Sequence, residues 1–342
     1  MITGFGRLGK TVAAVAMAVT LASPLASSAQ DATPAPYTPS ADVSSLSGEI
    51  SVDGSSTVGP IMQALAEEFA GVASGVQVPV GISGTGGGFK RFCDGETDIS
   101  NASRPINDEE AATCAANGVD YYIFQVAYDG ITVVVNPEND WVDCITVDQL
   151  NKIWAPDSTV KNWSDVDPSW PNEPISLYGP GPDSGTFDYF TEVINGKTDA
   201  SRTDYSPSED DNVLVQGVAG DTNALGYFGL AYYEENADSL KALEIDGGNG
   251  CVAPSTETVR DGSYAPLSRP LFVYVKAESF NKPEVAEFIN FAVANAPSIA
   301  AEVGYVASPD QVYVDDQAKL AAIAAGTATP DSQAAAAATP EA

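Results

Sequence analysis

The sequence predicts an α/β protein made of two lobes, and three observations lead to this fold class. Strand-like and helix-like segments alternate through residues 48–325, and these roughly 280 residues exceed the usual size of one domain. Two strand-like segments each end in a turn rich in glycine and hydroxyl side chains that opens a helix. Two further strand patterns, at residues 131–135 and 270–275, are placed so that the chain crosses twice between the lobes.

The N-terminus has the pattern of an export signal. Arg7 and Lys10 precede an apolar run at residues 12–25, and residues 27–29, Ser-Ser-Ala, have the small side chains that a signal peptidase accepts. The run is interrupted by a serine and a proline and is shorter than the roughly 20 apolar residues of a membrane span. We therefore expect residues 1–29 to be a signal peptide and the mature protein to be exported.

The two ends of the mature chain have compositions that are typical of disorder. Residues 30–47 are rich in Pro, Ala, Ser and Thr, so we expect a flexible leader. From Gly326 the composition is reduced almost to Ala, Thr, Pro and Ser. Residues 326–342 are therefore predicted to form a disordered tail.

The charge balance excludes several kinds of partner. With 47 acidic and 15 basic residues, the chain has a formal net charge of −32, which argues against nucleic acid or an anionic membrane. The chain contains no His, so it lacks the commonest general base and a favoured metal ligand. We expect a soluble monomer that is not an enzyme and needs no metal or cofactor.

The four cysteines indicate disulfide bonds, because the chain is predicted to be exported. Four cysteines allow three connectivities, and the sequence does not decide among them. We favour Cys93 with Cys114 and Cys144 with Cys251.

The first two strand-to-helix turns place hydroxyl groups where a ligand is expected. A strand at residues 48–53 ends at residues 54–57, Gly-Ser-Ser-Thr, before a helix. Residues 76–82 alternate with period two, as a strand does, and run into residues 83–88, SGTGGG, and a second helix. Ligands in open α/β sheets bind beyond the carboxyl ends of strands. These turns supply the candidate ligand-binding residues Ser56, Thr57 and Thr85.

A cation follows the next strand-like segment. Residues 98–106, DISNASRPI, hold Ser103 and Arg104 before a proline, and Asn107 with Glu110 forms a plausible capping pair for the helix that carries Cys114. An arginine on a loop is usually only solvated. This one lies next to a hydroxyl, and its five fixed donors suit bidentate binding of an oxyanion.

The second lobe begins after residues 128–130, Tyr-Asp-Gly. The β-branched run at residues 131–135 fits a strand that is buried on both faces, and we take it as the first crossing. A capped helix at residues 146–154 and a helix at 230–235 follow, and the strand at 270–275 returns to the first lobe. The predicted bounds are 48–128 and 265–325 for the first lobe and 129–264 for the second.

The stretch at residues 179–190, GPGPDSGTFDYF, is typical of an anion site at a helix N-terminus. Ser184, Gly185 and Thr186 would begin the helix, and apolar residues that follow at helical spacing would dock it. The first N–H groups of a helix have no intrahelical acceptor and lie at the positive end of its dipole, so they bind anions. The alternative is that Asp183 or Ser184 merely caps the helix.

Four motifs together resemble one family, in order and in spacing: DGSSTV at 53–58, SGTGGGF at 83–89, ASRPI at 102–106 and DSGTFDYF at 183–190. The chain is similar, over about residues 47–325, to the periplasmic phosphate-binding proteins of high-affinity phosphate ABC transporters. The resemblance implies a type II periplasmic binding protein with a mixed sheet flanked by helices in each lobe and a two-crossing hinge. It also implies that the protein captures inorganic phosphate in the periplasm and delivers it to an inner-membrane permease.

The resemblance carries several residues over to the ligand site. Thr57 and Val58 match the hydroxyl and the backbone donor of the family's first turn, and Thr85 matches the Ser of its second turn. The Ser-Gly-Thr of the family's second lobe is matched by Ser184, Gly185 and Thr186.

The chain departs from the better-known members at two positions. Ser103 stands where they have an Asp, and Pro180 stands where they have an Arg. We therefore expect Arg104 to be the replacement cation and Asp129 to accept the proton of monohydrogen phosphate, a proton that sulfate lacks. Asp183 is a second candidate acceptor, and Asp129 could instead be only a residue of the hinge turn.

Two other functions follow from the same residues. The chain could bind another tetrahedral oxyanion or act as a phosphate sensor, since a fold does not determine function. An exported phosphohydrolase would use Ser184 or Thr57 as its nucleophile. That reading needs an activating base or metal, and the chain offers no His for the purpose.

Overall fold

The computed structural model describes residues 1, 4, 33–40 and 42–338, and those from 33 onward belong to one unit. The signal peptide predicted at residues 1–29 lies outside the described residues, apart from Met1 and Gly4. Among the described helices, none is both long and apolar enough to cross a bilayer.

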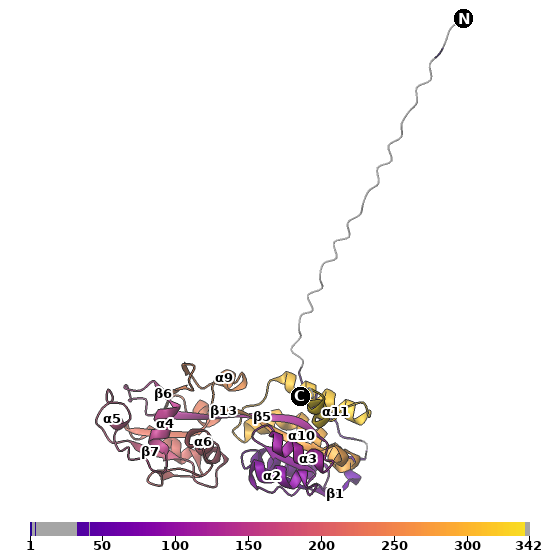
Figure 1. Ribbon diagram of the computed structural model, residues 1–342, viewed down its shortest axis with the longest axis horizontal. Helices are drawn as coiled ribbons and strands as arrows, with labels where there is room; N and C mark the ends of the chain where they lie inside the picture. Colours follow the sequence, from indigo (N-terminus) through magenta and orange to yellow (C-terminus); the bar gives the residue numbers. More distant parts are fainter. Residues whose placement is uncertain (2–3, 5–32, 41, 339–342) are drawn as a thin grey trace. The chain divides into compact units, whose positions relative to one another are not determined.

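One mixed sheet of eight strands runs through this unit. Its two longest strands, β5 (Tyr121–Val135) and β13 (Ser268–Lys276), lie side by side and antiparallel (Figure 1). β13 pairs with the first part of β5, and β9 pairs with the last part of β5. The remaining strands of the sheet are β2 (Val52–Gly54), β4 (Ile99–Ala102), β7 (Ser176–Gly179), β8 (Ser206–Pro207), β9 (Ala224–Gly229) and β10 (Lys241–Ala242).

Two small sheets and a set of helices complete the fold. The small sheets are β1 (Ser47–Glu49) with β3 (Gly75–Gln77), and β6 (Cys144–Thr146) with β11 (Glu244–Asp246) and β12 (Cys251–Val252). The helices are η1 (Val43–Ser45), α1 (Gly59–Val72), α2 (Gly84–Cys93), α3 (Asp108–Ala116), α4 (Val147–Trp154), α5 (Trp163–Val166), α6 (Gly185–Asn195), α7 (Asp211–Ala219), α8 (Leu230–Glu235), α9 (Thr256–Arg260), η2 (Ala277–Asn281), α10 (Pro283–Glu302), α11 (Asp310–Ala324) and α12 (Asp331–Ala338).

The buried apolar side chains form two main cores. The first is built from α1, α10 and the nearby strands, and the second from α4, α6 and the strands β5, β7 and β9. The boundary between the two cores lies between Ala127 and Ile131 on β5. Near β13 it lies between Leu267 and Leu271. We call the parts built around these cores the first and second lobes. The predicted α/β fold, in which two strands connect two lobes, is confirmed.

Local capping signals correctly located several helix starts. Asn107 and Glu110 form a capping box at α3, and Thr146 with Gln149 forms one at α4. Such reciprocal hydrogen bonds satisfy backbone donors that have no acceptor inside the helix. Other details were wrong. Asp129 and Gly130 lie inside the continuous strand β5 rather than in a turn, and of the strand predicted at 76–82 only β3 and one bridge, from Val80 to Val52, are formed.

The predicted flexible leader is wrong for the described residues 33–40 and 42–47. The hydroxyl of Tyr37 donates to Glu287, and its ring packs edge-on against Phe291 at 5.1 Å between centroids. The backbone of Ala35 exchanges hydrogen bonds with the amide side chain of Gln317. The composition signalled disorder, but contacts with α10 and α11 hold this segment in place.

The predicted disordered tail is wrong for residues 331–338, which form α12. Three N–H groups on the free edge of β5 donate to side chains of α11 and α12. Gln125 donates to Asp316 Oδ2 (3.2 Å), Ile123 to Asp331 Oδ2 (2.7 Å) and Tyr121 to Ser332 Oγ (3.3 Å). Since an uncovered strand edge leaves its donors free to pair with other chains, α11 and α12 protect this edge.

Asp316→Asn is expected to remove a loss of stability that the native protein undergoes as the pH rises. Burial raises the pKa of Asp316 to about 7, whereas the pKa of an aspartate in an unfolded chain is about 3.9. Between these values the folded protein keeps a proton that the unfolded chain has released. The free energy of unfolding therefore falls as the pH rises, by at most about 1.4 kcal/mol per pH unit.

Urea unfolding near pH 5 and near pH 8 checks this prediction. The decrease between the two conditions should be smaller in Asp316→Asn than in the native protein. Asp315→Asn is the matched control, because Asp315 is exposed on the same helix. Equal decreases in the native protein and in Asp316→Asn would contradict the prediction.

Both favoured cysteine pairings are confirmed. Cys93 bonds to Cys114 and joins α2 to α3, and Cys144 bonds to Cys251 and joins β6 to β12. The two disulfides therefore lie in different lobes.

Candidate functional site

A polar cavity of about 220 Å³ lies where the two lobes meet. It brings together most of the predicted residues of the first lobe: Ser56, Thr57, Thr85, Ser103 and Arg104. Thr85 and Ser103 share a hydrogen bond of 3.0 Å between their hydroxyls. The second lobe contributes Asp188, Glu192 and Thr198, and β13 contributes Arg269.

A second cavity, of about 320 Å³, shares Ser56 with the first. It contains the remaining predicted residues of the second lobe together with both candidate proton acceptors: Asp129, Asp183, Ser184, Gly185 and Thr186. The predicted site residues are therefore divided between two adjoining cavities. Val58 is fully buried, and its N–H already donates to Ser55 Oγ (3.3 Å).

The two lobes touch between these cavities. The hydroxyl of Thr57 donates to the carbonyl oxygen of Gly185 (3.3 Å), and the hydroxyl of Ser56 donates to Asp188 Oδ2 (2.5 Å). Both contacts join the segment that enters α1 to the first turn of α6. The two lobes are therefore in direct contact beside both cavities.

The anion site predicted at the N-terminus of α6 has the expected local geometry. Ser184 is the N-cap residue, and its hydroxyl accepts a hydrogen bond from the N–H of Thr186 (3.2 Å). The helix then runs for 11 residues to Asn195, so its dipole adds to the attraction for an anion at the start. The capping role and the anion-binding role of this stretch are compatible, because only one of the free N–H groups is used by the cap.

Sequence reasoning missed the most buried cation of the site, Arg269 on β13. Its side chain is 11% exposed, and its guanidinium lies over the ring of Tyr189, 3.5 Å from the centroid. Its Nη2 donates to the hydroxyl of Thr57 (2.7 Å). One signal could have revealed it: the Ser-Arg-Pro at residues 103–105 recurs at residues 268–270.

Arg269 also determines the surroundings of Asp129. The Nε of Arg269 lies 3.4 Å from Asp129 Oδ2, and Asp129 is 1% exposed. Burial raises the pKa of Asp129, and the positive charge of Arg269 opposes that shift. Asp129 is therefore the buried counter-ion of Arg269.

Arg104 lines the cavity as predicted, but its donors are shared with an acidic residue. Its Nη1 and Nη2 each lie 2.8 Å from the carboxylate of Glu110. These hydrogen bonds raise the pKa of Arg104, so it remains positively charged. Its guanidinium also lies 5.7 Å from the ring centroid of Phe89. Two arginines thus serve one cavity, and the expectation that Arg104 alone supplies the positive charge is wrong.

The cavity also contains two carboxylates that were not predicted to be there, those of Asp188 and Glu192. Burial raises the pKa of Asp188, and the neighbouring Asp199 adds to that shift while the hydrogen bond from Ser56 opposes it. Asp188 and Glu192 line the cavity that holds both arginines, whereas the two candidate proton acceptors, Asp129 and Asp183, line the adjoining one.

Comparisons with known proteins agree on one kind of relative. A family model described as a PBP superfamily domain matches residues 29–296. Protein SphX of Synechocystis is 51% identical over 273 residues, which are 79% of this chain and 81% of SphX. The phosphate-binding protein PstS of Staphylococcus saprophyticus is 42% identical over 282 residues, 82% of this chain and 86% of PstS.

Solved structures give the same result. A possible phosphate-binding protein from Planctomyces limnophilus is 53% identical with a TM-score of 0.79, covering 81% of this chain and 99% of its own. A putative phosphate ABC transporter substrate-binding protein with bound phosphate, from Clostridium perfringens, is 27% identical with a TM-score of 0.52, covering 76% of this chain and 99% of its own.

Proposed function

This chain belongs to the PBP superfamily and, within it, to the phosphate-binding proteins, and from this membership we propose that it captures inorganic phosphate between its lobes. It then delivers the phosphate to the permease of an ABC transporter. The observation that carries the proposal is the placement of Arg269. This nearly buried guanidinium lines a cavity that is otherwise walled largely by hydroxyl groups, at the contact between the lobes.

The chemistry of the site suits a small oxyanion. Guanidinium donors form short, strong hydrogen bonds to phosphate oxygens, and a low-dielectric site strengthens them. Hydroxyls and the free N–H groups of a helix start supply further donors without adding net charge. The proposed ligand-binding residues are Ser56, Thr57, Val58, Thr85, Ser103, Arg104, Asp129, Ser184, Gly185 and Thr186, with Arg269 added.

Closure of the lobes would trap the ligand. The proposed lobes are residues 48–128 with 265–325, and residues 129–264, and they are joined by β5 and β13. The contacts from Ser56 and Thr57 to the first turn of α6 hold the two walls together. Closure of this kind removes water from the ligand and lets both lobes contribute donors.

We place this activity outside the cytoplasm. The export pattern at residues 1–29 supports removal of a signal peptide, and the proposed site of action is the periplasm, next to the membrane permease. Its relatives are binding proteins, such as PstS of Staphylococcus saprophyticus, so the proposed role is capture rather than catalysis.

Isothermal titration of the mature protein, stripped of phosphate, tests the proposal. We expect a single tight site for phosphate and binding of sulfate that is weaker by at least about a hundredfold, or about 2.7 kcal/mol. The physical reason is that a carboxylate at the site can accept the proton of phosphate but repels fully ionised sulfate. Absence of heat with phosphate, or equal affinity for the two anions, would contradict the proposal.

A further inference from the structure

The Cys93–Cys114 disulfide lies at the end of α2 that is farther from the cavity. It joins the last residue of α2 to α3, and both cysteines are 1% exposed. The other end of α2 borders the cavity, because Gly84, Thr85 and Gly86 line it. The disulfide thus connects one helix that begins at the cavity to the neighbouring helix α3.

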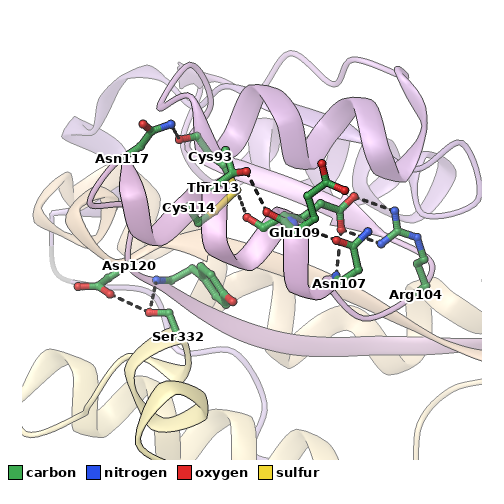
Figure 2. The surroundings of a disulfide bond; sticks show 11 residues. Cys93, Arg104, Asn107, Glu109, Thr113, Cys114, Asn117, Asp120 and Ser332 are labelled. Carbon is green, nitrogen blue, oxygen red and sulfur yellow. Dashed lines mark hydrogen bonds and ion pairs between the residues drawn. A yellow bond between two sulfur atoms is a disulfide. The ribbon is translucent and has the colours of Figure 1, made fainter. Parts of the chain in front are cut away.

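A short chain of contacts leads from the disulfide to Arg104. Cys93 Sγ lies 3.4 Å from the carbonyl oxygen of Glu110 on α3. The carboxylate of Glu110 holds both terminal nitrogens of Arg104 and also accepts the N–H of Asn107 (3.0 Å). Figure 2 shows Arg104 and Asn107 near one end of α3 and the disulfide farther along it. The position of α3 therefore decides where Glu110 holds Arg104.

α3 has little else to fix it. Of its residues, all of which are described, Cys114 alone is buried. The apolar cluster beneath it is separate from the main core of the first lobe and consists of Phe89, Phe92, Cys93, Ala102, Cys114, Val119, Tyr121 and Tyr274. Asn117 adds one hydrogen bond, from its side chain to the carbonyl oxygen of Cys93 (2.9 Å). The disulfide therefore contributes more to fixing the position of α3 than it would if α3 packed on a large core.

We propose that the Cys93–Cys114 disulfide is a positioning element of the anion site, which sets phosphate affinity by holding α3 and, through Glu110, the guanidinium of Arg104. This inference rests on the proposed function. A held guanidinium loses less conformational freedom when it binds, and this pre-organisation is gained as affinity. Without the link, α3 can shift and Arg104 loses its fixed place at the cavity.

The second disulfide provides a matched control. Cys144–Cys251 joins two strands of the small three-stranded sheet in the second lobe. Its removal also opens a covalent loop, with a sequence separation of 107 compared with 21 for Cys93–Cys114. A general loss of stability therefore affects both variants, whereas a loss of position at Arg104 affects only one.

The test compares C93A/C114A and C144A/C251A by titration with inorganic phosphate, at a temperature at which circular dichroism shows both to be folded. We expect about a tenfold loss of affinity in the first and less than about a twofold change in the second. In an Arg104→Ala background, removing Cys93–Cys114 should cause no further loss, because coupled residues are not additive. Equal losses in the two disulfide variants, or a full additional loss in the Arg104→Ala background, would overturn the proposal.

Glu110→Ala in the protein with both disulfides intact keeps the test decisive if C93A/C114A does not fold. Since it frees Arg104 from α3, it should weaken phosphate binding several-fold. It also removes the capping box of α3, but a lost cap costs only about 1 kcal/mol, so the protein should remain folded during the titration. Unchanged affinity would overturn the proposal.

The native protein distinguishes this inference from the proposed function. If the native protein gives no heat with phosphate, the proposed function fails and this inference fails with it. If the native protein binds phosphate but the variants do not show the expected losses of affinity, the inference alone fails.

Discussion

Gly185→Ala is expected to abolish tight phosphate binding while leaving the protein folded. A Cβ at this position would lie 2.8 Å from the Cα, the backbone nitrogen and the Oγ1 of Thr57 in the opposite lobe. Cβ atoms essentially never approach other heavy atoms closer than 3.0 Å. The obstructing atoms include backbone, so they cannot rotate away. The lobes would therefore stop short of contact, and we expect affinity to fall by roughly a hundredfold or more.

The same substitution should not harm the fold of the second lobe. Gly185 is the first residue of α6, and its φ lies outside the left-handed region, so alanine is compatible with the helix and favours it. Gly71→Ala on α1 is the control, because a Cβ there would meet no described atom within 4 Å. Titration gives the affinity, and the rise in melting temperature with added phosphate gives an independent measure. Native affinity in Gly185→Ala would show that this contact is not part of the bound state.

Arg269→Ala is expected to cause a comparably large loss of phosphate affinity, together with a loss of stability in the absence of ligand. The substitution removes the most buried positive charge at the cavity and the donor to Thr57. It also leaves Asp129 buried without its counter-ion. Breaking a buried ion pair by removing one partner destabilises proteins by about 3–5 kcal/mol.

A pair of variants separates these two effects of Arg269. Arg269→Ala combined with Asp129→Asn removes the unpaired charge, so it should recover much of the lost stability but none of the lost affinity. Arg269→Lys keeps the charge but loses the planar fork and the stacking on Tyr189, so it should recover affinity only in part. Recovery of native affinity in the double variant would exclude Arg269 as the cation that binds phosphate.

The pH dependence of Arg269→Ala offers a further check on the same prediction. Burial already raises the pKa of Asp129, and the charge of Arg269 opposes that rise, so the pKa rises further when the arginine is removed. A folded-state pKa above the unfolded value means that the folded protein binds more protons. The free energy of unfolding of Arg269→Ala should therefore decrease as the pH rises, more steeply than that of the native protein. Parallel profiles would contradict this account.

Most elements of the fold followed from patterns that act over a few residues. The capping pair Asn107–Glu110 and the capped helix predicted at residues 146–154 correctly located two helix starts, because an N-cap and the residue three positions later bond to each other. Ser184 was one of the two N-cap candidates in the sequence, and its hydroxyl accepts the N–H of Thr186. Composition was the weaker guide. It indicated disorder at both ends of the mature chain, although residues 33–40 and 331–338 are held by contacts with distant helices and strands.

Local sequence patterns predicted only part of the candidate site. Arg104 stood out because it follows a strand and lies next to a hydroxyl, but its bidentate pairing with Glu110 was not expected. Arg269 was overlooked even though its Ser-Arg-Pro repeats the motif around Arg104. Apart from that repeat, its role depends on a distant contact, since Thr57, to which it donates, lies 212 residues away.

The amino-acid pattern alone therefore specified the α/β class, the turns that carry hydroxyl groups, the helix that begins at Ser184 and the family resemblance. Folding specified which cation is buried at the cavity, which carboxylates line it, and that Gly185 meets Thr57 across the lobes. The physical reason is the range of the interactions. Caps and strand periodicity act within a few residues, whereas the contact between Thr57 and Gly185 joins residues 128 positions apart and exists only after the two lobes have come together.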